Sequence, residues 1–161
     1  MLKRVLFAVV GALSALAVGA AGAYFTTQVQ VADSMIKAGS VAISTVPTSA
    51  PLAIDSLAPG MPETRQLSVV NDGTLPTDVI VTASKKAGVT EFYNALTCRV
   101  SCGGTPVYDG KLAELKTAPL RLAPGAKGEL KFEVSLPATA TNTLANDYAR
   151  VSLYVDAEQA H

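Results

Sequence analysis

Short stretches in which apolar and polar residues alternate recur along this chain from Tyr24 to its end. The clearest lies at 129–136, where every second residue is apolar: Leu130, Phe132, Val134 and Leu136. A period of two predicts a strand with one face in a core and the other in solvent. Weaker versions of the pattern predict further strands at 24–31, 41–45, 66–71, 96–100, 105–108 and 150–155. The run Asp78–Ala83 is apolar on both faces, which predicts a central strand.

Turn-forming residues separate these stretches at intervals of about ten residues, as in antiparallel β-sandwiches. The sequence Leu-Ala-Pro-Gly occurs twice, at 57–60 and 122–125, and an alternating stretch follows each copy. We interpret both copies as corners at which the chain passes between two sheets. Further turns are predicted at Asn71–Gly73, Lys85–Gly88, Gly103–Gly104 and Asp109–Gly110.

Helical patterns are short. Lys111–Lys116 predicts one or two turns, and Ala138–Asn146 predicts a linker with a helical turn. Neither is long enough to connect parallel strands. The sequence therefore predicts an all-β fold, an antiparallel jelly-roll or Ig-like β-sandwich with one or two short helical turns, preceded by a signal peptide.

The first residues have the pattern of an export signal. Two positive charges in MLKR are followed by a run without charge from Val5 to Phe25. Ala21 and Ala23 are the small residues that a signal peptidase needs, which predicts cleavage before Tyr24. The alternative is an uncleaved anchor, because the run is close to the ~20 residues of a membrane span. We predict a signal peptide at 1–23, an N-terminal strand and linker at 24–37, and a sandwich domain at 38–161.

Cleavage would leave 11 basic and 13 acidic residues, a net charge of −2. This balance gives no electrostatic reason to expect nucleic acid or an anionic membrane as a partner. Contact with a membrane is expected only through the signal peptide, and the protein is expected to be secreted, in an extracellular matrix or at the cell surface.

The two cysteines are Cys98 and Cys102. Export would place them in an oxidising environment, which favours a disulfide between them. On a straight strand, a rise of ~3.3 Å per residue would separate them by ~13 Å, so a bridge requires a turn or bulge at 99–101. The alternative is two free thiols, one of them packed in the core.

Residues suited to catalysis are few. His161 is the single histidine and the last residue, so it is a poor fixed general base. A cysteine nucleophile would lack a histidine partner, and the zinc-protease and P-loop motifs are missing from the sequence. We predict no enzymatic activity, no cofactor and no metal site. Calcium binding stays open at four aspartates interpreted as turn residues: Asp72, Asp78, Asp109 and Asp147.

Several stretches resemble a known family when they are taken in order. They are G-A-A-G-A-Y-F, A-G-S-V-A-I-S, V-V-N-D-G-T-L-P-T-D-V, Y-D-G-K-L-A-E-L and N-D-Y-A-R-V-S-L-Y-V-D-A-E-Q, with the two L-A-P-G copies between them. This arrangement resembles the TasA/camelysin (CalY) family of secreted biofilm-matrix fibre proteins, which a SipW-type signal peptidase processes. The resemblance covers nearly the whole chain.

The resemblance implies a jelly-roll-like subunit of extracellular fibres, in which the N-terminal strand of one subunit completes the sheet of the next. On this chain the donor segment would be 24–33. Its assembly residues would be Tyr24, Phe25, Thr27, Val29 and Val31. The implied partners are neighbouring copies of the chain and, during export, the signal peptidase. The alternative is that the strand pairs within its own subunit.

Two other functions stay open from the sequence. The camelysin name implies a secreted metalloprotease, although the sequence offers no set of metal ligands for it. A monomeric surface adhesion module, retained by an uncleaved N-terminal helix, is the other.

The cleavage site gives the first testable prediction. Mass spectrometry of the exported protein is expected to find Tyr24 as the N-terminal residue, because the small residues Ala21 and Ala23 precede it. An intact mass that includes residues 1–23 would contradict cleavage and favour the anchored alternative.

Overall fold

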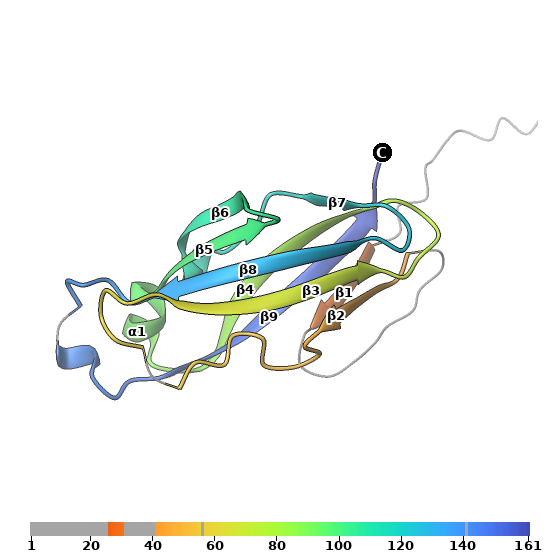
Figure 1. Ribbon diagram of the computed structural model, residues 1–161. Helices are drawn as coiled ribbons and strands as arrows, with labels where there is room; N and C mark the ends of the chain where they lie inside the picture. The colour runs from red at the N-terminus through yellow and green to blue at the C-terminus, as the bar shows by residue number, and fades with distance from the viewer. Residues whose placement is uncertain (1–25, 31–40, 56, 141) are drawn as a thin grey trace, which may run out of the picture.

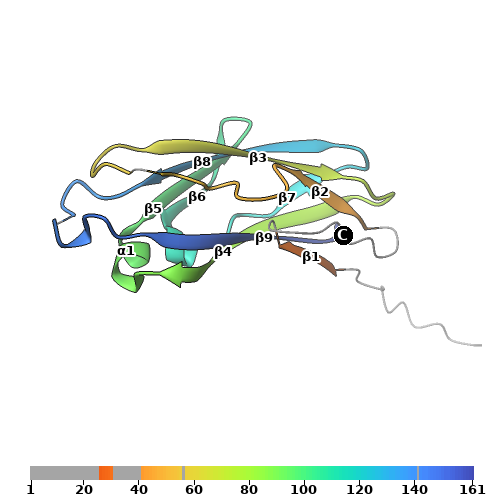
Figure 2. The same cartoon turned by 90° about the horizontal axis from the view of Figure 1, so that it is seen from below.

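Residues 26–30, 41–55, 57–140 and 142–161 are described by the computed structural model of the chain. They form two antiparallel sheets, with strand orders β1-β9-β4-β7 and β2-β3-β8-β5-β6 (Figure 1). The strands are β1 (Thr26–Gln30), β2 (Ile43–Val46), β3 (Glu63–Asn71), β4 (Thr77–Gly88), β5 (Thr97–Cys102), β6 (Thr105–Lys111), β7 (Leu120–Leu122), β8 (Lys127–Ser135) and β9 (Ala149–Gln159). Figure 2 shows the two sheets stacked face to face. The predicted all-β sandwich is confirmed.

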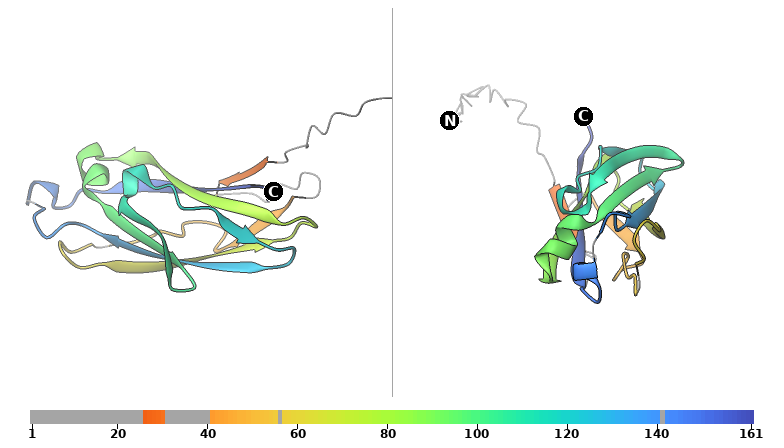
Figure 3. Two further views of the ribbon diagram at one scale, coloured as in Figure 1. Left: turned by 90° about the horizontal axis from the view of Figure 1, so that it is seen from above. Right: turned by 90° about the vertical axis from the view of Figure 1, so that its left-hand side faces the viewer.

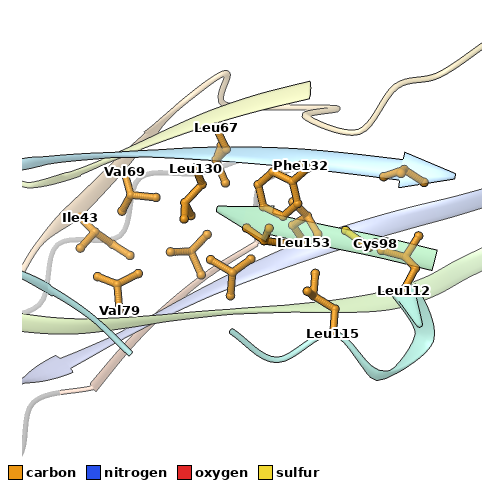
Figure 4. Close-up of a cluster of buried hydrophobic side chains, with 14 of the residues drawn as sticks. Ile43, Leu67, Val69, Val79, Cys98, Leu112, Leu115, Leu130, Phe132 and Leu153 are labelled. Atoms are coloured by element: carbon orange, nitrogen blue, oxygen red, sulfur yellow. The ribbon is translucent and has the colours of Figure 1, made fainter. Parts of the chain in front are cut away.

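The alternation seen in the sequence reappears as alternating burial. In β8, Leu130, Phe132 and Val134 are buried, while the residues between them are exposed or half-buried. The opposite sheet contributes buried residues such as Val79 from β4 and Leu153 from β9. Figure 4 shows the side chains of Leu130 and Phe132 meeting those of Val79 and Leu153 between the sheets. Burial of this apolar layer, at about 25 cal/mol per Å², is the main force that holds the sandwich together.

β4 and β9 form the longest ladder among the described strands. All eleven residues of β9 pair with β4, from Thr77 opposite Gln159 to Gly88 opposite Ala149. The predicted turn at Lys85–Gly88 is therefore wrong, because the strand continues through it with a bulge between Lys85 and Ala87. The predicted strand end at Asp109–Gly110 is also wrong, since both residues lie inside β6, paired with β5.

The helices are short. The 3-10 helices η1 (Leu112–Glu114) and η2 (Asn142–Leu144) lie where helical turns were predicted, whereas α1 (Thr90–Ala95) was not predicted. Among the described residues, no helix has the length and apolar character required to cross a membrane. The loop that contains η2 and the strand β1 lie at opposite ends of the sandwich, and the C-terminus is at the β1 end (Figure 3).

The two Leu-Ala-Pro-Gly segments have different roles. The copy at 122–125 leads from β7 in one sheet to β8 in the other, as predicted. The copy at 57–60 lies between β2 and β3, which belong to the same sheet, so the prediction of a corner between sheets is wrong there. Gly60 and Gly125 both have positive φ values, of 77° and 74°, which suit glycine. Gly60 N–H also donates to the Leu136 carbonyl at 2.7 Å.

A buried amide holds the end of the sandwich where β3, β4 and β7 meet. The Asn71 side chain is fully buried, and its Nδ2 donates to the carbonyls of Leu75 at 2.8 Å and Leu122 at 3.1 Å. Its Oδ1 accepts a hydrogen bond from the Gly73 amide at 2.9 Å. One side chain thus satisfies backbone groups from two segments far apart in sequence.

The backbone of Asn71 adds two more bonds at the same corner. Its N–H donates to Ala126 O at 3.0 Å, and its carbonyl accepts from Gly125 N–H at 2.8 Å. These bonds attach the second Leu-Ala-Pro-Gly corner to the end of β3. We refer to this arrangement of Asn71, Gly73, Leu75, Leu122 and the corner at 123–126 as the Asn71 corner.

Replacing the amide is expected to destabilise the fold strongly. Asn71→Leu would leave two carbonyls and one amide without their partner in a buried site, which should lower the free energy of unfolding by about 2–4 kcal/mol. Denaturant unfolding followed by circular dichroism would measure this. The control is Asn94→Leu on the exposed side of α1, which should change stability by less than about 0.5 kcal/mol. Equal effects of the two substitutions would contradict the role given to Asn71.

Candidate assembly edge at β1 and β9

β1 is the outermost strand of the four-stranded sheet, and β9 is its neighbour there. The two strands are antiparallel, from Thr26 opposite Glu158 to Gln30 opposite Tyr154. β1 covers one half of β9, the half nearer the C-terminus. An edge strand of this kind is held along one side only.

The register relates β1 to the core. Thr27 is opposite Ala157 and Val29 is opposite Val155, and these two β9 residues are fully buried. Directly opposed residues lie on the same face of an antiparallel pair. The predicted assembly positions Thr27 and Val29 are therefore the two β1 positions that pair with buried residues of β9.

Other predicted positions fall outside the described residues. These are the assembly residues and cleavage-site residues Tyr24, Phe25, Val31, Ala21 and Ala23. The structure does not test the predicted role of any of them.

The outer face of this edge carries a polar pair. Gln28 is exposed and stands opposite Asp156. Partial burial raises the pKa of the Asp156 carboxyl, and a hydrogen bond from Gln28 offsets part of this rise. A hollow of about 410 Å³ adjoins the pair and is lined by Gln28, Asp78, Ile80, Asp156, Ala157 and Glu158.

Asp78 lies in the same hollow with a different environment. Arg121 on β7 donates to it twice, from Nε at 2.9 Å and from a terminal nitrogen at 2.8 Å. This bidentate contact lowers the pKa of Asp78. Asp78 was interpreted as a turn residue, but it is the second residue of β4, and Asp109 likewise lies within β6.

A second hollow region lies at the other end of the sandwich. A cavity of about 140 Å³ has a mainly apolar lining, and an adjoining hollow of about 610 Å³ shares six lining residues with it. We call this region the end groove and define it by Leu52, Ile54, Phe92, Tyr148 and Val151. Tyr148 is 59% exposed at its rim. The groove therefore presents an aromatic ring and aliphatic side chains to solvent.

The predicted disulfide is wrong. Cys98 and Cys102 are free thiols on β5, which pairs without interruption with β8 from Thr97 to Cys102. The register shift against the other neighbour skips Val107, so the extra residue is on β6. β5 therefore stays extended, and a rise of ~3.3 Å per residue keeps the cysteines ~13 Å apart. Burial, with a smaller effect of Asp109, raises the pKa of Cys98 to about 12.

The described residues contain no group of three or more histidine, cysteine or acidic side chains arranged to hold a metal ion. Several acidic side chains have basic partners instead, as Asp109 has Arg99 at 2.8 Å. Neither a scan against models of protein families nor a search of curated proteins finds a match for this chain.

Sequence reasoning identified β1 but missed the residues around it. Asp156 is a polar residue on an alternating strand, and only the register places it opposite Gln28. Phe92 and Tyr148 come from α1 and from the residues before β9, and no periodic pattern marks them. The isolated aromatic residues outside strands were the one available signal.

Asp156 gives a pH-dependent prediction. Because its folded-state pKa is raised, the ionised carboxylate costs stability at neutral pH, and the cost disappears as pH falls through that pKa. Asp156→Asn should therefore have a higher free energy of unfolding than the parent at pH 7, and the gain should shrink towards pH 4. Denaturant titrations at several pH values measure it. Glu158→Gln, an exposed change on the same strand, is the control. A gain that does not vary with pH would contradict the cause given.

Proposed function

We propose that this chain is a secreted structural subunit, without catalytic activity, that polymerises into extracellular biofilm-matrix fibres or pili by head-to-tail donor-strand complementation. β1 of one subunit takes the place beside β9 of the next. The observation that carries the proposal is the position of β1. It is a five-residue strand at the edge of the four-stranded sheet, next to β9, and residues 31–42 separate it from β2.

Exchange of this strand conserves its contacts. A donated β1 makes the same ladder with β9 as an internal one, so the balance between them depends on association entropy and on the connecting residues. The donated strand and the edge that accepts it are different surfaces, so the contact is head-to-tail. Where such a contact does not close into a ring, its repetition builds a filament. The resemblance to secreted fibre proteins supports the same reading.

The remainder of the fold supports a stable acceptor body. The ladders β4–β9, β3–β8 and β5–β8 do not involve β1. Without β1, the edge of β9 beside buried Val155 and Ala157 would lack a covering strand along residues 154–158. An open edge of this kind favours binding of another strand.

A mixing experiment tests the exchange. Gln28→Cys and Asp156→Cys are made in separate chains, each with Cys102→Ser so that the half-exposed thiol is removed. Opposed residues in an antiparallel ladder have Cα atoms about 4.5–5.5 Å apart, within the range of a disulfide. Assembly of the mixture followed by mild oxidation is expected to give a covalent heterodimer with a 28–156 bond, identified by peptide mapping.

The controls define failure. Gln28→Cys mixed with Lys131→Cys, an exposed position on β8 of the other sheet, should give no heterodimer. Deletion of 24–31 should leave a folded protein that forms no filaments in electron micrographs. In a chain that carries both Gln28→Cys and Asp156→Cys, the bond should also form between chains. A 28–156 bond found only within single chains of this double variant, or normal filaments from the deletion, would contradict the proposal.

A further inference from the structure

The direction of β1 limits where the donor subunit can lie. β1 begins opposite Glu158 and ends opposite Tyr154, so it runs towards the start of β9 at Ala149. The donor body continues from its own β2, after residues 31–42. A donated strand therefore leaves the acceptor in the direction of the end groove, whose lining includes Tyr148, which precedes β9, and Val151, the third residue of β9.

The connection is long enough to pass that end. Residues 31–42 span at most about 40 Å when fully extended. Beyond the end of the donated β1, the acceptor's β9 continues from Tyr154 back to Ala149, a length of about 17 Å at ~3.4 Å per residue. The remaining length allows the donor body to lie beyond the acceptor, in line with it.

The same topology fixes which part of the donor faces the acceptor. β2 begins at Ile43, opposite Asn71, at the end of its own body that carries the Asn71 corner. The end groove includes Phe92 of α1. Figure 1 shows α1 at the end of the sandwich far from the start of β2. A donor placed in line therefore turns its Asn71 corner towards the end groove of the acceptor.

We infer that the end groove is the docking surface for a second copy of this chain, which contacts it through the Asn71 corner. The inference rests on the proposed function and adds to strand exchange a contact between bodies. A mainly apolar cavity beside Tyr148, a residue that is 59% exposed, suits burial against a protein surface. Because groove and corner are different surfaces at opposite ends, the contact repeats along a fibre in the direction set by β1.

A substitution at the rim tests the contact. Tyr148→Asp places a charge on an exposed position, where the fold should tolerate it, and is expected to raise the protein concentration needed for filament formation about tenfold or more. The 28–156 bond between chains should still form at high concentration, because β1 and β9 are unchanged. Thr105→Asp, an exposed change in the β5–β6 hairpin, is the matched control and should assemble as the parent does.

A cross-linking experiment tests the partners directly. Tyr148→Cys and Pro124→Cys, at the groove and on the exposed corner, are mixed in the Cys102→Ser background and assembled with a short bis-maleimide. Links between positions 148 and 124 are expected, and links between two copies of position 148 are not.

The outcomes separate the two proposals. Assembly of Tyr148→Asp at the same concentration as the Thr105→Asp control, or links only between equivalent positions, would overturn the docking surface while strand exchange stands. Absence of the 28–156 heterodimer when Gln28→Cys and Asp156→Cys chains that retain Tyr148 are mixed would instead overturn strand exchange. Links between 148 and 124 in that case would establish the end contact without it.

Discussion

The Asn71 amide is the constraint on which the geometry of the candidate assembly edge depends. The Asn71 side chain bonds to the carbonyl of Leu75, between β3 and β4, and to the carbonyl of Leu122 in β7. It therefore fixes the corner at which the chain passes from β3 in one sheet to β4 in the other. β4 starts immediately after this corner, and the register of β4 sets that of β9 along its whole length. β9 in turn is the strand beside β1. A buried and fully bonded amide is costly to disturb, so the position of the edge is determined far more firmly than β1 itself is held.

The period-two pattern was sufficient to predict the class of fold and most strands, since a half-buried strand needs an apolar residue at every second position. The errors occurred where the pattern and the backbone disagree. A turn was predicted at Lys85 and Lys86 because they are charged. Instead, β4 pairs with β9 up to its last residue, Gly88. Within the bulged end of β4, the Lys85 side chain donates to the Gly88 carbonyl at 3.0 Å. Asp109 is tolerated inside β6 because Arg99 on the neighbouring strand neutralises it.

Of the two strands that form the candidate site, β1 could be predicted from the sequence, whereas its pairing with β9 could not. The predicted cleavage before Tyr24 and the alternating pattern pointed to β1, because both are read from the local sequence. Its neighbour is the last strand of the chain, and no local property of β9 marks it as that neighbour. The opposition of Gln28 and Asp156 follows from long-range register alone. The cysteine prediction failed for a related reason, since pairing of β5 with strands on both sides prevents the bend that a bridge requires.

In the proposed fibre, β1 must bind weakly enough to leave its own subunit and specifically enough to return in one register. Its five residues on a sheet edge satisfy the first condition, because edge segments open at a lower free energy cost than central strands do. The buried neighbours Ala157 and Val155 satisfy the second, since a shift by one residue would change which β1 residues are paired with them. The outer Gln28–Asp156 pair adds little binding at neutral pH, because the cost of partly burying the ionised Asp156 carboxylate offsets the gain from its hydrogen bond with Gln28. Specific contacts of low net strength of this kind are what repeated exchange between identical subunits requires.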